Sequence, residues 1–337
     1  MDVIKAIIQK PKLNLKKLES ALASFVDKEI KGGQGEQSVN PLVTFLSHHP
    51  PKKGAESRIL FHKVLLCMKI LLRNEKNRQI LLSPHSSVAF DRIVFFLSDP
   101  LGSREIAKEV CNVLLNLCHS SGSVPVIVER GVIFHLVKLF TKISIQDAEV
   151  LFAVLGACQS VCTEKDGRME FMCHVVSERG EVMTRINDIL LFCDDNKENV
   201  AAQCHYIDKV KERALSLLHN LSADGSNIAI IRDAKVIPVL IPFLRSCRPN
   251  LVNGAASTLQ NMSREVKSRE IMHALNVTIL MLDLVGGNDM KIQIIAAATL
   301  LNLVGERLSN HHLKTKNIFH ETLTELITLG ALCDCFE

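Results

Sequence analysis

The sequence contains no tryptophan and a single tyrosine, Tyr206, and aromatic residues make up only 4% of its 337 residues. A core must therefore be built mainly from Leu, Ile, Val, Ala and Met, which suits closely packed helices and argues against β-sandwiches and barrels. The shortage of aromatic rings also argues against the cages that hold methylated lysine and the platforms on which nucleic-acid bases stack.

Long apolar runs and strong charge are missing as well. No run of about 18 apolar residues occurs, so we expect no membrane insertion. The formal net charge of +4 is too mild to indicate a nucleic-acid partner. The first residues lack a signal-peptide core, and the 11 cysteines are an odd number. Together these features predict reduced thiols and a cytoplasmic location, with the nucleus as the alternative.

Motifs for catalysis and metal binding are also missing. The sequence has no phosphate-binding glycine loop and no dinucleotide fingerprint, and its 13 histidines are scattered without a recognisable nucleophile nearby. Cys333 and Cys335 form one close pair without a second pair. Cys158 and Cys162, four residues apart in an apolar stretch, are expected to be packed thiols. We therefore expect no enzymatic activity, no cofactor and no metal.

The chain does contain a recurring triplet in which an asparagine stands near the end of an expected helix, mostly between apolar residues. The central residues of the triplets are Asn116, Asn220, Asn261 and Asn302. The last three stand 41 residues apart. A period in the forties indicates stacked repeats of two or three helices.

Each repeat is expected to contain a short first helix, an apolar second helix and a third helix that ends at the asparagine. Second helices should begin near a small or turn-forming residue, at Gln37, Ser87, Gly131, Gly180, Lys235 and Asn276. Third helices contain small residues where helices cross, as at 296–298. The third helix at 148–162 departs from the pattern, because Gln159 stands where an asparagine is expected.

This register predicts two parts. Residues 1–36 form an N-terminal helical cap and a glycine-rich linker, and residues 37–337 form the repeat domain. Loop insertions are expected near 47–56 and 193–208. A last, incomplete repeat begins near Asn317, and its apolar end can be an unusual cap, the end of a shortened chain, or a surface covered by a partner. Stacked repeats with poor caps can also associate end to end.

Residues 214–244 carry a family likeness. They contain Ala-Leu-Ser-Leu-Leu-His-Asn-Leu-Ser, then Asn-Ile-Ala-Ile-Ile, then Val-Ile-Pro-Val-Leu. This stretch closely resembles the armadillo consensus, and the likeness extends over roughly 37–329. The resemblance implies an all-α, right-handed solenoid of about six to seven three-helix repeats. The family includes nuclear import adaptors, junction and signalling proteins, co-chaperones, small-GTPase exchange factors and ciliary assembly factors.

In armadillo proteins the third helices line a concave groove, and their asparagines hydrogen-bond the backbone of an extended peptide. The resemblance therefore implies that Asn116, Asn220, Asn261 and Asn302 bind a partner segment. An amide suits this role because it offers both a donor and an acceptor. The alternative is that each asparagine caps its helix or fixes the following loop.

One departure from the family bears on the partner. Import adaptors have tryptophan four residues before the asparagine, and this chain has Asn112, Ser216, Ser257 and Ala298. Binding of basic import signals is therefore not expected.

Lysines lie further back on the same expected helices, at Lys108, Lys209 and Lys291. Their offsets from the asparagines, near two and three helical turns, place them close to the same face. They favour an acidic partner segment, and the alternative is a solvated helix face.

These observations favour a protein–protein interaction scaffold, or adaptor, that binds an extended segment of another protein along the concave groove. Two alternatives stay open. One is a chaperone-type assembly factor that holds apolar client segments. The other is a regulator or exchange factor of a small GTPase, for which the sequence shows no marker.

Overall fold

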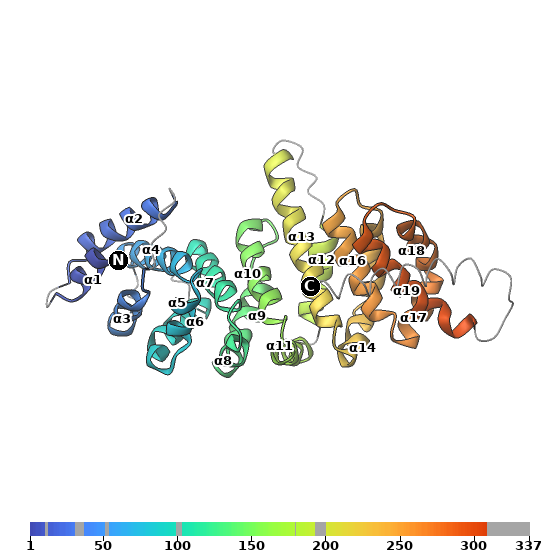
Figure 1. Ribbon diagram of the computed structural model, residues 1–337, viewed down its shortest axis with the longest axis horizontal. Helices are drawn as coiled ribbons and strands as arrows, with labels where there is room; N and C mark the ends of the chain where they lie inside the picture. Colours follow the sequence, from blue (N-terminus) through green and yellow to red (C-terminus); the bar gives the residue numbers. More distant parts are fainter. Residues whose placement is uncertain are drawn as a thin grey trace. The chain divides into compact units, whose positions relative to one another are not determined.

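A computed structural model describes residues 1–10, 13–30, 37–50, 54–98, 103–178, 180–192 and 200–308. Every regular element in these ranges is a helix, which confirms the predicted all-α fold. Backbone contacts divide the chain into two compact units, Met1–Ser177 (unit 1) and Glu178–Glu337 (unit 2). Figure 1 labels the helices in chain order.

Unit 1 consists of stacked helical repeats. Its helices are α1 (Asp2–Ile8), α2 (Leu15–Ile30), α3 (Asn40–His48), α4 (Ala55–Leu71), α5 (Glu75–Leu82), η1 (Pro84–Ser86), α6 (Ser87–Ser98), α7 (Arg104–Leu117), α8 (Ser123–Glu129), α9 (Val132–Lys142), α10 (Ala148–Val161) and α11 (Lys165–Ser177). Second helices pack on second helices, α3 on α6 and α6 on α9. Third helices do the same, α4 on α7 and α7 on α10 (Figure 1).

Unit 2 repeats this arrangement. Its helices are α12 (Glu181–Leu191), α13 (Val200–Ser222), α14 (Gly225–Asp233), α15 (Val236–Leu240), η3 (Ile241–Arg245), α16 (Pro249–Met262), α17 (Val266–Ala274), α18 (Val277–Val285) and α19 (Met290–Leu308). The third helices α13, α16 and α19 pack in that order. The second helix of the middle repeat is divided into α15 and η3, because Pro242 lacks the N–H that an α-helix would need there.

The junctions between first and second helices explain why the register could be seen in the sequence. Gly131, Gly180, Lys235 and Asn276 each precede a second helix and have left-handed φ angles of 65°, 86°, 59° and 56°. Glycine and asparagine adopt this conformation most readily, because a side chain there crowds the backbone. The chain thus turns sharply at the positions predicted.

The first repeat begins later than expected, with α3 starting at Asn40 rather than beside Gln37. The cause is a contact between repeats. The backbone N–H of Val39 donates to Asn77 Oδ1 at 3.0 Å, and Asn77 Nδ2 donates to the carbonyl of Gln37 at 2.8 Å. These bonds hold the residues before the helix.

The N-terminal helices are stacked onto the repeats of unit 1. Helix α1 packs on α3, and α2 packs on α4 in the row of third helices. Lys63 Nζ lies 2.7 Å from Glu19 Oε1, and the Cys67 thiol points to the carbonyl of Leu22 at 3.7 Å. The division at residue 36 stays a prediction, since the expected linker at 31–36 lies outside the described residues.

One predicted insertion needs correction. Residues 200–208, which we assigned to a loop near 193–208, form the first turns of the 23-residue helix α13. Alanines and a glutamine at 201–203 favour helix, and the polar stretch that suggested a loop ends just before them. Residues 193–199, residues 51–53 of the other insertion and the incomplete last repeat from 309 onward lie outside the described residues.

The core consists mainly of aliphatic side chains, as expected, with phenylalanines added. Five phenylalanines are among its largest fully buried side chains: Phe45, Phe90, Phe96, Phe140 and Phe171. Cys158 and Cys162 are buried free thiols, as the sequence indicated. Burial raises the pKa of Cys158 to about 12, so this thiol is held in its unreactive, protonated form.

Candidate binding surface

The asparagines of unit 2 occupy equivalent places on three adjacent third helices. Asn220 is half-buried near the end of α13, Asn261 is buried on α16, and Asn302 is half-buried on α19. Asn261 Nδ2 donates to Ser222 Oγ at 3.1 Å and to the carbonyl of His219 at 3.3 Å. Asn302 Nδ2 donates to Ser263 Oγ at 2.8 Å. Each amide nitrogen thus joins its helix to the preceding third helix.

Asn116 does the same in unit 1, where its Nδ2 donates to the carbonyl of Lys69 on α4 at 2.8 Å. The amide oxygens of Asn116, Asn261 and Asn302 accept no hydrogen bond from any residue that the structure describes. These side chains therefore use their donors inside the protein and keep an acceptor for a group outside it. A structural role and a partner-binding role of the asparagines are compatible, because the first uses the amide nitrogen and the second the amide oxygen.

Small side chains leave room beside the asparagines of unit 2. Four residues earlier on the three helices stand Ser216, Ser257 and Ala298. Ser216 Oγ donates to a carbonyl of its own helix, and Ser257 is buried. In unit 1 the equivalent Asn112 donates to Glu109 Oε2 at 3.2 Å. The surface of α13, α16 and α19 around the asparagines is therefore shallow and polar.

The three predicted lysines differ in their surroundings. Lys108 pairs with Glu149 of α10, with 3.2 Å between Nζ and Oε2. Lys209 Nζ lies 5.8 Å from the centre of the Tyr206 ring. Lys291 is exposed and forms no ion pair within the described part of the chain. The lysines open to a partner therefore lie in unit 2.

Unit 1 has instead a series of ion pairs between neighbouring third helices. Besides Lys108–Glu149, the series contains Glu19–Lys63 at 2.7 Å, Lys69–Glu109 at 2.6 Å and Arg104–Asp147. Each pair joins one third helix to the next and cancels one positive charge. An acidic segment is therefore not attracted by the charges of these pairs.

Two kinds of residue in these repeats were not predicted from the sequence. Arg213 is half-buried seven residues before Asn220, which places it on the same side of α13. In addition, three repeats share a hydrogen bond between a third helix and the first helix that follows it. In each, an arginine of the first helix donates to carbonyls at the end of the third helix; the arginines are Arg78, Arg168 and Arg269. The three arginines occupy equivalent places five or six residues after those carbonyls, and this shared offset was the signal that could have revealed them.

His219 is the titratable group closest to these asparagines. Its Nδ1 lies 3.4 Å from Asn261 Nδ2. Burial lowers the pKa of His219, the positive charge of Lys291 adds to this effect, and a hydrogen bond with the backbone of Ser257 opposes it. The equivalent residue of the next repeat is Gln260, which has no charge to lose or gain.

Replacing His219 by glutamine should make the stability of the protein less dependent on pH. The folded protein holds His219 at a lower pKa than the unfolded chain, so below the ordinary value of 6.5 the unfolded chain binds more protons. Stability is therefore complete above that pH and is lost as the pH falls. Urea midpoints measured between about pH 7.5 and 5.5 should fall less in His219→Gln than in the wild type. Equal slopes in the two proteins would contradict this assignment, and burial of His62 and His135 should leave a remaining slope in both.

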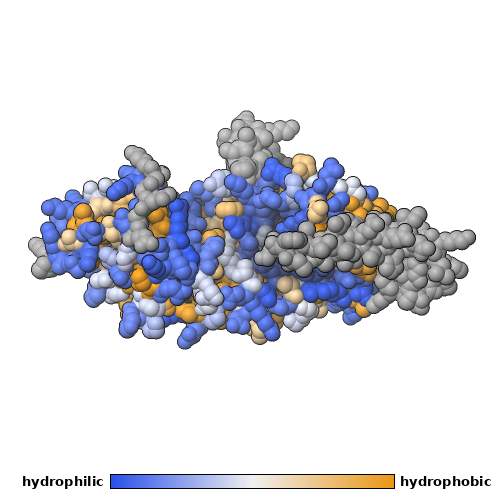
Figure 2. All heavy atoms as spheres, in the orientation of Figure 1, coloured by the Kyte–Doolittle hydropathy of each residue, from blue (hydrophilic) through white to orange (hydrophobic). Residues whose placement is uncertain are grey.

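Within the described ranges, no group of three or more His, Cys, Asp or Glu residues could hold a metal ion. No single helix in these ranges is long and apolar enough to cross a membrane. One bent pair of helices, Glu75–Leu82 with Pro84–Ser98, meets the requirements of a membrane span in length and composition only. The face seen in Figure 2 is mainly hydrophilic, with hydrophobic residues in separate patches.

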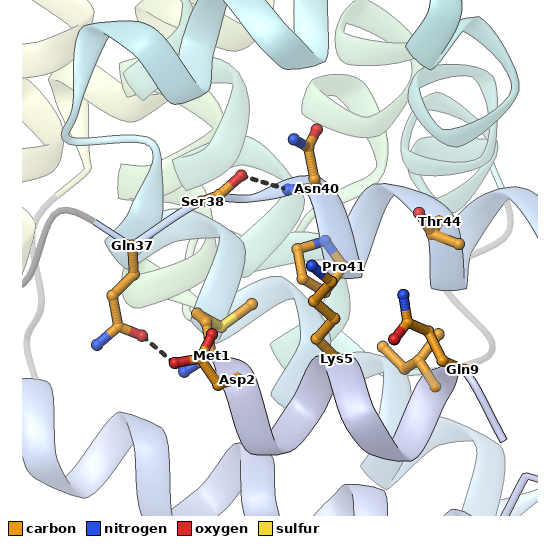
Figure 3. A pocket seen from close by; sticks show the side chains of 10 residues that line it. Met1, Asp2, Lys5, Gln9, Gln37, Ser38, Asn40, Pro41 and Thr44 are labelled. Carbon is orange, nitrogen blue, oxygen red and sulfur yellow. Dashed lines mark hydrogen bonds between the residues drawn. The ribbon is translucent and has the colours of Figure 1, made fainter.

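Pockets occur at the N-terminal end of unit 1, among the residues that the structure describes. One, of about 480 Å³, lies between α1 and α3 and is lined by polar side chains such as Lys5, Asn40 and Thr44 (Figure 3). Another, of about 690 Å³, lies between the start of α2, the end of α3 and the start of α4. None of the predicted site residues lines either pocket.

Comparison with known proteins agrees with this architecture. The family model for the Armadillo/beta-catenin-like repeat matches residues 226–264, which span the complete repeat of α14, α15, η3 and α16. No curated protein sequence matches the chain. An engineered protein of solved structure matches with a TM-score of 0.63 at 14% identity, over 80% of this chain and 99% of that chain.

Two designed armadillo proteins are similar as well. One was computationally designed for modular peptide recognition and matches with a TM-score of 0.61 at 14% identity, over 79% of this chain and 99% of that chain. The other, solved in complex with the peptide (KR)4, matches with a TM-score of 0.56 at 15% identity, over 89% and 98% of the two chains. The fold is that of an armadillo-type solenoid, and residues 226–264 match the armadillo repeat itself.

Proposed function

We propose that this chain is a non-catalytic scaffold that holds an extended, acidic segment of a partner protein against α13, α16 and α19. The supporting observation is the set of open amide oxygens on Asn261 and Asn302, repeated every 41 residues beside small side chains. Packed helices lie about 8–10 Å apart, and an extended chain advances about 3.3 Å per residue. Successive asparagines can therefore bond backbone N–H groups two or three residues apart.

The charge of the partner segment follows from the side chains beside the asparagines. Lys291 is exposed on α19, Lys209 is half-buried on α13, and Arg213 adds a third positive charge. Glu212 lies on α13 as well, so the surface is only partly basic. One designed armadillo protein holds the basic peptide (KR)4. For this chain we propose the opposite sign of peptide charge, because cations lie beside the asparagines and the chain has no tryptophan.

We place this activity in the cytoplasm. Cys158 and Cys162 are buried and unpaired, which supports a compartment that keeps thiols reduced.

The test compares two double variants of unit 2, Asn261→Ala with Asn302→Ala, and Ser222→Ala with Ser263→Ala. Both variants remove the Asn–Ser bonds between third helices, and only the asparagine variant also removes the bond from Asn261 Nδ2 to the His219 carbonyl. Both serines are fully buried and cannot touch a partner. Partners captured from cells by the wild type and identified by mass spectrometry should bind the serine variant normally. They should bind the asparagine variant about thirtyfold more weakly, because each of the two lost hydrogen bonds costs about 1 kcal/mol.

Equal weakening in the two variants would show that the asparagines act only through the fold. Unchanged binding in both would move the binding site away from this surface. Capture of many unrelated apolar clients, insensitive to either variant, would favour the chaperone-type alternative over an adaptor. Circular dichroism of both variants confirms that helix content is equal before binding is compared.

A further inference from the structure

The larger pocket of unit 1 has the features of a binding site for an aromatic side chain. It is lined by Leu15, Lys16 and Glu19 of α2, by residues from Phe45 to Pro50 around the end of α3, and by residues from Gly54 to Phe61 at the start of α4. Its volume of about 690 Å³ lies within the range of about 300–1,000 Å³ that is usual for ligand pockets.

The inner wall of this pocket is apolar and held in place by the core. Phe45, Leu60 and Phe61 line it with only 1%, 4% and 3% of their surfaces exposed. The Phe45 ring lies 5.7 Å from the Phe61 ring, and Phe61 lies 5.3 Å from Phe96. Because these rings pack on one another, the apolar wall is continuous with the core of unit 1.

Aromatic rings at this wall already stack on one another, in an arrangement that a further ring can extend. His49 stacks on Phe45 with 4.9 Å between ring centres and 12° between planes. Rings prefer partners at about 4.5–7 Å in stacked or edge-on arrangements. A ring that enters the pocket would therefore gain ring contacts as well as burial of apolar surface.

Two histidines supply hydrogen-bond acceptors at the rim. His48 Nδ1 lies 2.8 Å from the carbonyl of Thr44, and His49 Nδ1 lies 3.2 Å from the carbonyl of Phe45. Since a carbonyl only accepts, each Nδ1 bears the hydrogen, and in the neutral ring Nε2 is then an acceptor. Neither Nε2 bonds any residue within the described ranges. Among the rim carboxylates, Glu19 is already paired with Lys63.

We propose that this pocket binds the tryptophan side chain of a partner protein, with the indole ring against Phe45 and His49 and the indole N–H donated to a histidine Nε2. An apolar ring that contains one donor matches an apolar wall with neutral acceptors at its edge. The pocket is larger than a single ring, so residues flanking the tryptophan also enter, which favours a protein segment over a free small molecule. This site lies in unit 1 and does not depend on the function proposed for unit 2.

The absence of tryptophan from the chain makes the test direct, since all indole fluorescence comes from the probe. The probe is the blocked tripeptide acetyl-Gly-Trp-Gly-amide. Its emission should shift to shorter wavelength and saturate at one peptide per chain. Ala55→Phe, an exposed rim position, should weaken binding at least tenfold by filling the pocket. Thr44→Phe is the matched control, because Thr44 lines the smaller pocket and does not line this one (Figure 3).

A second variant, His49→Phe, keeps a ring stacked on Phe45 and removes one acceptor. It should weaken binding of the tryptophan peptide several-fold and leave competition by acetyl-Gly-Phe-Gly-amide unchanged. The proposal is overturned if binding does not saturate, or if Ala55→Phe binds as the wild type does. It is also overturned if Thr44→Phe weakens binding equally, or if free indole binds as tightly as the tripeptide.

Discussion

Lys69→Met is expected to lower the free energy of unfolding by about 3 kcal/mol, which is a large part of the stability of an ordinary domain. Lys69 Nζ lies 2.6 Å from Glu109 Oε2, and the side chain of Glu109 is only 4% exposed. Without the lysine, this carboxylate keeps the hydrogen bond from Asn112 at 3.2 Å within the described part of the chain. A buried charge that loses its partner costs far more than the pair itself contributes.

The neighbouring ion pair provides the control. In Lys63–Glu19 the glutamate side chain is 33% exposed, so Lys63→Met should cost at most about 1 kcal/mol. Adding Glu109→Gln to Lys69→Met should restore most of the lost stability, because the buried charge is then gone. Urea midpoints followed by circular dichroism compare the four proteins. A similar loss in both single variants would mean that Glu109 is not held by Lys69.

Gly167→Ala is expected to destabilise unit 1 by a similar amount, on the order of 3 kcal/mol. Gly167 lies in the first turn of α11, directly against the end of α10. A Cβ added there would lie 1.8 Å from the carbonyl oxygen of Val161 and 3.1 Å from Val124 Cγ1. Because the first contact is with backbone, α11 would have to move away from α10.

Other repeats show why this position is sensitive. Asn77 and Asn227 stand at the equivalent place, and each donates from Nδ2 to the carbonyl six residues earlier at 2.9 Å. At Gly167 the backbone itself approaches that carbonyl. Gly225→Ala is the control, since nothing lies within 4 Å of its added Cβ and alanine favours helix. If Gly167→Ala unfolds at the same temperature as the wild type, Gly167 does not lie this close to the Val161 carbonyl.

The repeat architecture could be predicted because its signals are local. A left-handed residue such as Gly131 or Asn276 stands at four of the turns from a first helix to a second. An asparagine near the end of a third helix recurs at the same register because each repeat faces the same neighbour. In unit 2 the step from Lys235 to Asn276 and both steps between Asn220, Asn261 and Asn302 are 41 residues. The start of α13 was misplaced, because a polar segment just before it hid the helix boundary.

The sequence by itself thus determined the fold class, the register of the helices and the surface on which the asparagines gather. Only the tertiary structure decided what each of these side chains does there. Lys108 meets Glu149 and Asn302 meets Ser263, residues about forty positions away in sequence. Such pairings depend on how one repeat is rotated against the next, which no local pattern encodes. The pocket beside Phe45 has the same origin, because its wall is assembled from three helices that only packing brings together.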